Sequence, residues 1–399
     1  MAITSNSLLV PPLPPEIIEW EILTRLPVKS LLLYKSVCKS WNLLISSNHE
    51  FIKSQLVLNP NKDSLMLDVY YGHSNSFISK SEIIGCINGL VCFYRCKIDD
   101  SEVGEIAIWN PALNQCLVIL TLPKKDIRHH NVLLGFGFDS VANDFKVMYG
   151  NLIRNQPLAI DVYSCKAACW KKIAPSNILY SGGIYNLREP AIVSGCPFWL
   201  IQKNEDAEFS LAVIWFDVRH EVFRLLPSFS CIGRLQSKDC VLMNFRDSFA
   251  IMVYDLWANF VKPIDVYTFN HRCSVWNKIS IGPFTFKEPN IKLNGMISDG
   301  KHKVLEEATI KLGILVPCSR NGDILFVNPH GYKLYSINPE THTIKILKER
   351  DSVDENRFKC FNYSESLIFI EGMKPVHEYS RDKGRFRFLV RERLELGAS

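Results

Sequence analysis

The sequence predicts a small all-α unit followed by a large all-β domain, and a β-propeller is the expected form of the second. Three observations lead to this prediction. Apolar side chains recur at helical spacing over about the first sixty residues. Beyond them the chain consists of short β-branched and aromatic runs separated by Gly, Asn, Asp and Pro. Within this second part, one hairpin pattern returns at steps of about fifty residues.

The first predicted helix begins near Pro15, because proline is tolerated in the first turn of a helix, and it ends at Pro27. A second apolar stripe follows, and Ser47 and Asn48 offer N-cap oxygens for a last short helix. Three or four short helices are therefore expected over residues 11–56. The stripes consist of Ile17, Ile18, Ile22, Leu23, Leu26, Val28, Leu31, Leu32, Leu33, Val37, Trp41, Leu44, Ile45, Phe51, Ile52 and Leu56.

This helical unit is too small to bury its own apolar residues. A chain of this size hides only about 60% of its surface on folding. A partner protein could cover the remaining stripe, or the helices could pack on the rest of the same chain. The physical argument leaves both interpretations open.

The all-β domain is expected over residues 60–380. Its strands are predicted where β-branched and aromatic residues cluster between turn signals. The predicted strands are 65–71, 90–94, 105–109, 145–149, 160–163, 212–216, 251–256, 324–327 and 366–370.

One hairpin pattern recurs in this domain: an apolar strand that ends in an aromatic residue, six to eight polar or small residues, and a second apolar strand. The aromatic residues are Trp109, Tyr163, Phe216, Tyr267 and Tyr335, at steps of 54, 53, 51 and 68 residues. A period near 50 is typical of kelch-type propeller blades and predicts six to seven blades. A β-sandwich of similar hairpins is the alternative. The hairpins are IAIWNPALNQCLVIL, IDVYSCKAACWKKI, VIWFDVRHEVFRLL, IDVYTFNHRCSVWNKI and KLYSINPETHTIKIL.

Two segments depart from this pattern. Residues 299–313 account for the longer last step, and they are interpreted as an inserted loop or short helix, either a substrate element or a tolerated surface insertion. The tail 381–399 holds six basic and three acidic residues and alternates Arg with apolar residues. It is interpreted as a strand that closes the ring or as an exposed basic arm.

Composition narrows the function classes. The chain has 399 residues with 47% hydrophobic and 22% charged residues, which is typical of a globular protein. Its net charge is +5, of which the tail supplies +3, so nucleic acid is not an expected partner. No membrane-spanning run or secretory signal is recognised, so the cytosol or the nucleus is the expected location. The thirteen scattered cysteines are expected to be mostly buried, reduced thiols.

No catalytic, cofactor or metal site is predicted. The phosphate-binding loop, the zinc-protease motif and the nucleophile elbow are absent from the sequence. Gly135 and Gly137 are expected in a turn or a packed strand, because a third glycine of a nucleotide-binding loop is missing. His129 and His130 are expected in a solvated loop, since no third ligand is evident.

The segment LPPEIIEWEILTRLPVKSLLLYKSVCKSWNLLISSNHEFIKSQL resembles an F-box. The resemblance rests on the two Leu-Pro pairs, Lys-Ser-Leu after the second pair, Val-Cys-Lys-x-Trp, and a closing Phe51. It implies that residues 11–56 dock on the Skp-type adaptor of a cullin-RING ubiquitin ligase. For Val37, Trp41, Leu44 and Ile45 a purely internal role is an equal alternative. The positions implied to bind the adaptor, by meeting it or by shaping the surface that it meets, are Leu13, Pro14, Ile17, Ile18, Ile22, Leu26, Pro27, Val28, Leu31, Val37, Cys38, Lys39, Trp41, Leu44 and Ile45.

Most of residues 80–350 resembles the F-box-associated, kelch-like domain of plant F-box proteins, in particular the S-locus F-box-like group. The matching motifs are INGLVCFY, IAIWNPALNQ, LLGFGFDSVANDFKVM, IDVYSCKAACWKKI and AVIWFDVRHEVFRLLP.

Together the two resemblances imply a non-catalytic substrate receptor of an SCF-type ligase, whose β domain binds an unidentified target protein for ubiquitination. The alternatives are a propeller enzyme and a carbohydrate-binding module that stacks sugars on Trp199, Trp257 or Trp276.

Overall fold

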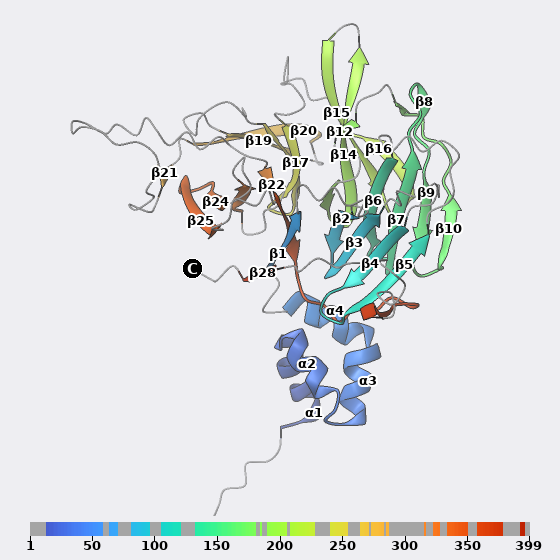
Figure 1. Cartoon of the computed structure of the whole chain (residues 1–399), viewed down its shortest axis with the longest axis vertical. Coiled ribbons are helices and arrows are strands. Elements are labelled where there is room, and N and C mark those ends of the chain that lie inside the picture. Colours follow the sequence, from blue (N-terminus) through green and yellow to red (C-terminus); the bar gives the residue numbers. More distant parts are fainter. Residues whose placement is uncertain are drawn as a thin grey trace, which may run out of the picture.

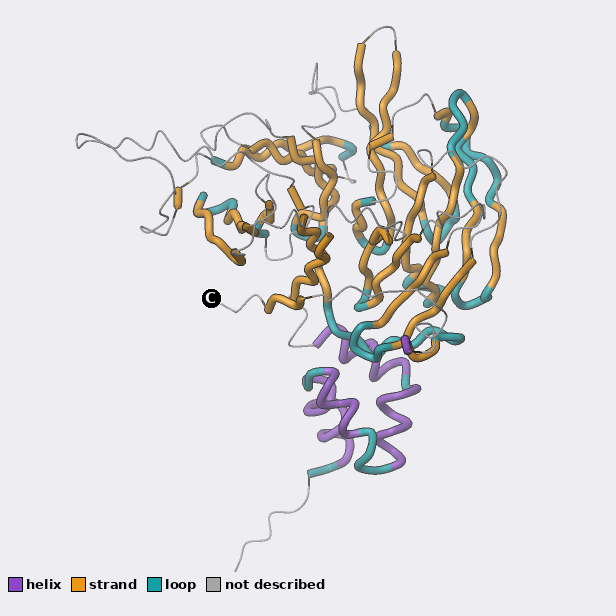
Figure 2. Tube along the Cα trace, viewed as in Figure 1, coloured by secondary structure: helices purple, strands orange, loops and turns teal. Residues whose placement is uncertain are grey.

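The computed structural model describes residues 13–58, 64–70, 81–95, 105–120, 132–180, 184–185, 190–205, 208–227, 240–253, 264–270, 273–282, 285–286, 315–316, 322–327, 333–349, 357–377 and 392–395. These residues form a helical unit and a β-propeller (Figures 1 and 2). The predicted fold class is confirmed. The insertion 299–313, His129 and His130 lie outside the described residues.

The helical unit is built as the apolar stripes predict. Asn48 caps the last helix, because its Oδ1 accepts a hydrogen bond from the Phe51 amide at 2.9 Å. Ser47 does not cap it; its hydroxyl donates to the Leu43 carbonyl instead. The helices are α1 (Pro15–Ile17), η1 (Ile18–Ile22), η2 (Leu23–Arg25), α2 (Val28–Tyr34), α3 (Lys39–Ser47) and α4 (His49–Leu58).

The β domain contains five sheets of four or five strands, which are named blades 1 to 5 in chain order. Blade 1 is β2 (Ser81–Ile87), β3 (Leu90–Arg95), β4 (Glu105–Asn110), β5 (Gln115–Leu120) and β27 (Lys374–Pro375). Blade 2 is β6 (Val132–Asp139), β7 (Asp144–Asn151), β9 (Asp161–Ser164) and β10 (Cys169–Lys172). Blade 3 is β12 (Ile184–Tyr185), β13 (Ala191–Val193), β14 (Cys196–Glu205), β15 (Glu208–Asp217) and β16 (Val222–Leu225).

The other two blades follow the same meander. Blade 4 is β17 (Cys240–Phe245), β18 (Ser248–Val253), β19 (Ile264–Asn270) and β20 (Val275–Ile281). Blade 5 is β21 (Thr285–Phe286), β22 (Leu315–Val316), β23 (Ile324–Val327), β24 (Lys333–Asn338) and β25 (Thr343–Glu349). A separate pair joins β8 (Gln156–Pro157) to β11 (Leu179–Tyr180).

A three-stranded closing sheet completes the ring. It pairs β1 (Ser64–Tyr70) from the N-terminal side with β26 (Arg357–Tyr363) and β28 (Glu392–Glu395) from the C-terminal side, all antiparallel. Its strand β26 contacts β2 of blade 1 and β22 of blade 5. The estimate of six to seven blades is met only if this sheet is counted with the five larger ones. The strand β28 lies in the tail, and the Arg-rich run before it lies outside the described residues.

Counted outward along each ladder from the inner strand, the recurrent hairpin is the third and fourth strand of every blade. An Asn or Asp at the end of the third strand often starts the turn, because its carboxyl or amide oxygen accepts hydrogen bonds from amides two or three residues later. Asn110, Asp217 and Asn338 all do so. Asp139 does the same in the turn that joins β6 and β7 of blade 2.

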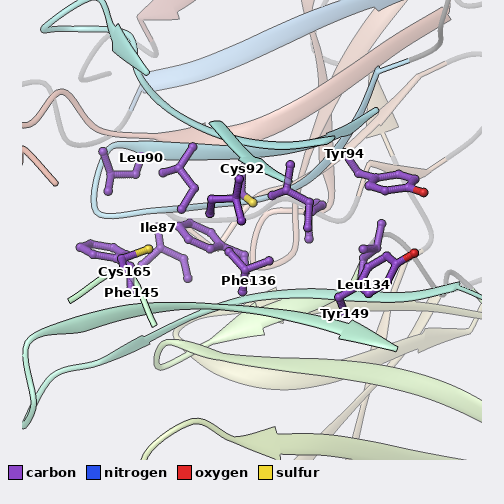
Figure 3. Packing of buried hydrophobic residues seen from close by; sticks show 14 of the residues in the cluster. Ile87, Leu90, Cys92, Tyr94, Leu134, Phe136, Phe145, Tyr149 and Cys165 are labelled. Atoms are coloured by element: carbon purple, nitrogen blue, oxygen red, sulfur yellow. The ribbon is translucent and has the colours of Figure 1, made fainter. Parts of the chain in front are cut away.

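Apolar side chains fill the space between neighbouring blades. Figure 3 shows Leu90 and Cys92 of blade 1 opposite Phe136 and Phe145 of blade 2. Similar clusters join blades 2 and 3, blades 3 and 4, and blades 4 and 5. This packing explains how hairpins that cannot bury both faces alone form one domain.

One predicted strand is wrong. Residues 366–370 form no strand; they follow β26 as irregular, mostly buried chain. Their carbonyls are used differently: Asn110 Nδ2 donates to the carbonyls of Ser366 and Ile368, at 3.0 and 2.8 Å. The β-like composition of residues 366–370 therefore reflects their burial and not pairing in a β-sheet.

Candidate functional site

The helical unit has a compact core, to which one residue of the propeller contributes. Seven side chains are buried together, and Trp20 contacts Phe51 at its edge with ring centroids 6.1 Å apart. Gln55 on α4 is tied to the link between η2 and α2, because its Nε2 donates to the Leu26 carbonyl. The seven are Leu23, Val28, Leu31, Leu44, Ile45, Phe51 and Leu367, and the last belongs to the propeller.

The surface of this unit is unusually apolar. Among the described residues, seventeen large apolar side chains are exposed, and nine of them lie within residues 13–58. Exposed apolar side chains that concentrate on one part of a chain are typical of a binding surface. The nine are Leu13, Ile17, Ile22, Leu33, Tyr34, Val37, Leu43, Val57 and Leu58.

The structure divides the predicted adaptor-binding residues into three groups. Leu13, Pro14, Ile17, Ile22, Val37, Cys38 and Lys39 are exposed, and Ile18, Leu26, Pro27 and Trp41 are half-buried. Val28, Leu31, Leu44 and Ile45 are buried in the helical core.

The four buried residues are ones for which the resemblance implied either contact with the adaptor or packing beneath the docking surface. In the helical stripe of α2, Val28 and Leu31 face inward onto the same core as α3 and α4. They shape the surface from beneath and offer no area to a partner. For Leu44 and Ile45 the internal role, which was an open alternative, is the one that the structure has.

Sequence reasoning missed Leu33 and Leu43 as surface residues. Leu33 is 73% exposed and Leu43 is 66% exposed. The helical period contains the signal: Leu33 lies two residues beyond the buried Leu31, about 200° further around the helix. Leu43 precedes two buried residues in α3 and lies outside their arc. A run of consecutive leucines concealed this difference.

Polar contacts at the edge of the surface are local. Arg25 pairs with Glu21 one turn earlier at 2.7 Å, and both side chains are exposed. Cys38 Sγ lies 3.1 Å from Ser40 Oγ at the start of α3. Hydrogen bonds from Ser40 and from the Trp41 amide lower the pKa of the Cys38 thiol. Partial burial, which disfavours the charged ammonium, lowers the pKa of Lys35.

The strands around the propeller axis are the second candidate site, apart from the helical surface. The inner strands β2, β6, β13, β14 and β17 pack on one another around the axis. Of the residues on these strands whose burial is known, the partly exposed ones include Cys86, Ile192, Val241 and Asn244. These four are uncharged, and no group of three metal-ligating side chains occurs among the described residues. Gly135 and Gly137 lie in β6, where the Trp199 and Val218 side chains approach them closely, as expected for a packed strand.

Neither of the two described tryptophans considered for sugar stacking forms an exposed platform. Trp199 is fully buried, and its Nε1 donates to the Leu134 carbonyl at 3.1 Å. Trp276 is half-buried and its Nε1 donates to the Pro227 carbonyl. Trp257 lies outside the described residues. Trp199 therefore belongs to the blade core.

Of the nine cysteines that the structure describes, all are free thiols and four are buried, so the expectation of mostly buried thiols is met only in part. Cys92, Cys116, Cys165 and Cys240 are buried, whereas Cys38, Cys169 and Cys273 are exposed. Desolvation raises the pKa of Cys116 to about 12 and raises that of Cys165 further. Within the described part of the chain, no helix is long and apolar enough to cross a membrane.

A small helical unit with an apolar surface, joined to a β-propeller, defines the class of protein. The comparisons identify it further. The family model of the F-box associated beta propeller domain matches residues 30–300. The chain therefore belongs to this family and is a plant F-box protein.

The relatives it matches are named as F-box proteins, and two of the three described next also carry a repeat in their names. An F-box/kelch-repeat protein of Arabidopsis thaliana is 28% identical over 270 residues, which cover 59% of this chain and 69% of the relative. An F-box protein of the same plant is 28% identical over 247 residues, 55% of this chain and 61% of the relative. The plant's F-box/WD-40 repeat-containing protein 1 is 30% identical over 186 residues, 40% of this chain and 42% of the relative.

Proposed function

We propose that this protein is a substrate-recognition subunit of an SCF-type cullin-RING ubiquitin ligase. The helical unit docks on a Skp-type adaptor, and the propeller binds a target protein for ubiquitination. The observation that carries the proposal is the concentration of exposed apolar side chains on a unit of the F-box type. A partner groove lined with apolar side chains is the surface that such helices fit.

The contact is built from the exposed group of residues. Leu13, Ile17, Ile22 and Val37 present large apolar side chains to the adaptor, and Leu33 and Leu43 add to this area. A few such side chains supply most of the affinity of an interface of this kind. The buried core beneath them holds the helices in the orientation that the adaptor recognises.

The protein acts by proximity and supplies no catalytic group. Holding a target close to the ubiquitin-loaded component of the ligase converts a bimolecular encounter into an almost intramolecular one, which raises the effective concentration of the target lysine. The reaction then takes place in the cytosol or the nucleus. A fluorescent fusion found only in the secretory route would contradict this location.

Co-migration of the purified full chain with a recombinant Skp-type adaptor on size exclusion tests the proposal. The variant combines Ile17→Glu and Ile22→Glu, which change exposed side chains and leave the core intact. The matched control is Ile153→Glu, which changes an exposed isoleucine of the propeller.

We expect the wild type and the control to co-migrate with the adaptor and the double variant to elute alone. Equal binding by all three would show that this surface is not the docking site. Absence of binding by the folded wild type would contradict the proposed function itself.

A further inference from the structure

A segment of the propeller reaches into the helical unit. It comprises residues 364–370, named the strap here, which connect β26 of the closing sheet to β27 at the outer edge of blade 1. Five of its seven side chains are buried although it has no regular secondary structure. Figure 2 shows loops of the propeller lying directly against the helices at this end of the domain.

The strap contributes a side chain to the helical core. Leu367 is buried and belongs to the same apolar cluster as Val28, Leu31 and Phe51. Two residues of the turn between β4 and β5, Ala112 and Leu113, pack against the edge of this cluster. The core of the helical unit is therefore assembled from segments more than three hundred residues apart in sequence.

Blade 1 holds the strap in place from two sides. Asn110 is fully buried at the end of β4, and its Nδ2 donates to the carbonyls of Ser366 and Ile368. Its Oδ1 accepts the Ala112 and Leu113 amides, so one amide group orders both the turn and the strap.

The second part of blade 1 that contacts the strap is the turn between β2 and β3. Gly89 has a φ of +80°, which favours glycine, and it lies directly against the strap. A Cβ at this position would meet the Ser366 side chain at 2.6 Å. Only a residue without a side chain lets the turn and the strap approach so closely.

The strap also continues into the core of blade 1. Ile370 is buried in the cluster between blades 1 and 2, and Ile368 packs against it. Leu367 and its neighbour Ile368 thus point into two different cores. A displacement of either core changes the packing of the other, because close-packed interiors transmit strain.

We propose that the strap is a structural part of the adaptor-docking unit: residues 13–58 attain their packed form only when residues 364–370 are anchored on blade 1. Leu367 and Asn110 are then positioning residues, which fix the helices relative to the propeller. The consequence for the adaptor rests on the proposed function, whereas the consequence for the helical core does not. A chain that contains the whole F-box sequence but lacks an ordered strap would dock poorly.

Hydrogen–deuterium exchange of the full-length chain, read by mass spectrometry, tests the strap directly. In Leu367→Ala we expect amides of α2 and α4 to exchange about tenfold faster or more, while blade 4 keeps its wild-type rates. The matched control is Phe369→Ala, which changes the strap residue that is 53% exposed and should leave α2 and α4 unchanged.

A reciprocal variant distinguishes coupling between the two segments from a general loss of folding. Val28→Ala removes a side chain from the helical side of the same cluster, and it should accelerate exchange in residues 364–370 without affecting blade 4. If Leu367→Ala and Val28→Ala each affect only their own segment, the two segments are not coupled and the inference is wrong. A uniform acceleration that includes blade 4 would likewise contradict it.

The adaptor provides the functional measurement. With the wild type bound to a recombinant Skp-type adaptor, Leu367→Ala should weaken the binding several-fold and Phe369→Ala should not. Full-strength binding by Leu367→Ala would refute a role of the strap in docking. If the wild type binds no adaptor, the proposed function fails, and the exchange data still decide whether the strap completes the helical core.

Discussion

Removal of the Lys146 ammonium should destabilise the junction between blades 2 and 3. Lys146 on β7 is buried, with 7% of its side chain exposed. Its Nζ donates to the Val218 carbonyl at 2.9 Å and pairs with Glu221 at 3.0 Å, both in the turn between β15 and β16. Asp139, also buried, lies 3.8 Å away. Lys146→Ala leaves these acceptors without their buried cation.

The magnitude follows from this environment. Breaking a buried ion pair costs about 3–5 kcal/mol, because the remaining charge is left uncompensated. Glu221 keeps Lys171 at 2.6 Å, but that lysine is 68% exposed and such a pair contributes only about 0–1 kcal/mol. We therefore expect a loss near the lower limit, about 3 kcal/mol. For a large domain this corresponds to a Tm that is roughly 6–12 °C lower.

Urea denaturation followed by tryptophan fluorescence, together with thermal unfolding, measures the effect. Lys171→Ala is the matched control, since it removes the exposed partner of the same carboxylate and should cost less than about 1 kcal/mol. The reasoning is refuted if Lys146→Ala unfolds within about 1 kcal/mol of wild type, or if both variants lose the same amount.

Three further predictions concern other parts of the molecule. Burial opposes ionisation of Glu221, but hydrogen bonds from two lysines outweigh this effect and lower the pKa of the carboxyl below the usual 4.5. The stabilisation by ionised Glu221 is therefore present above pH 4.5 and is lost as the pH falls through the folded-state pKa. The Tm difference between wild type and Glu221→Gln should therefore shrink on acidification, and a constant difference would contradict the assignment. Gly85→Ala should lower the free energy of unfolding by about 1–3 kcal/mol, because the added Cβ would collide with Ile192 Cδ1 across the inner strands. In a double-mutant cycle, Ile192→Val should recover much of this lost stability. Iodoacetamide at neutral pH should modify Cys38 in the native protein and Cys116 only after unfolding, as peptide mass spectrometry would reveal; early modification of Cys116 would contradict its burial.

Local chemistry made much of this fold predictable from the sequence. The hairpins were recognisable because their turns are encoded by neighbouring residues, such as Asn110 and Asn338, whose side chains bond amides within three positions. The helices were recognisable from their stripes for the same reason. Each of these signals lies within one element and needs no knowledge of distant contacts.

Features set by distant contacts were not predictable in this way. The segment 366–370 has the composition of a strand, yet the Asn110 amide takes its carbonyls and Leu367 enters the helical core. The candidate docking residues show the same limit. A motif identifies Ile17 and Val28 equally well, but only the packing of the helices on one another shows that Ile17 of α1 is exposed and Val28 of α2 is buried.

The outer edges of the blades are protected in two ways, and the strap participates in one of them. The outer strands of blades 1 and 5 are paired with additional short strands, β27 on β5 and β21 on β25. Among the described residues, the outer strands β10, β16 and β20 have no such partner and carry Lys171, Arg224 and Lys278 instead. Basic side chains on an edge oppose pairing with another chain.

Because β27 follows the strap directly, one short segment covers the edge of blade 1 and completes the helical core. Displacement of the strap in Leu367→Ala would then loosen the pairing of β27 with β5 as well. The same variant should expose the edge of blade 1, which carries no covering strand once β27 is released. An increase in concentration-dependent association of Leu367→Ala, absent from Phe369→Ala and measured by light scattering, is the expected result. Equal association of the two variants would mean that β27 holds its place on β5 without the strap.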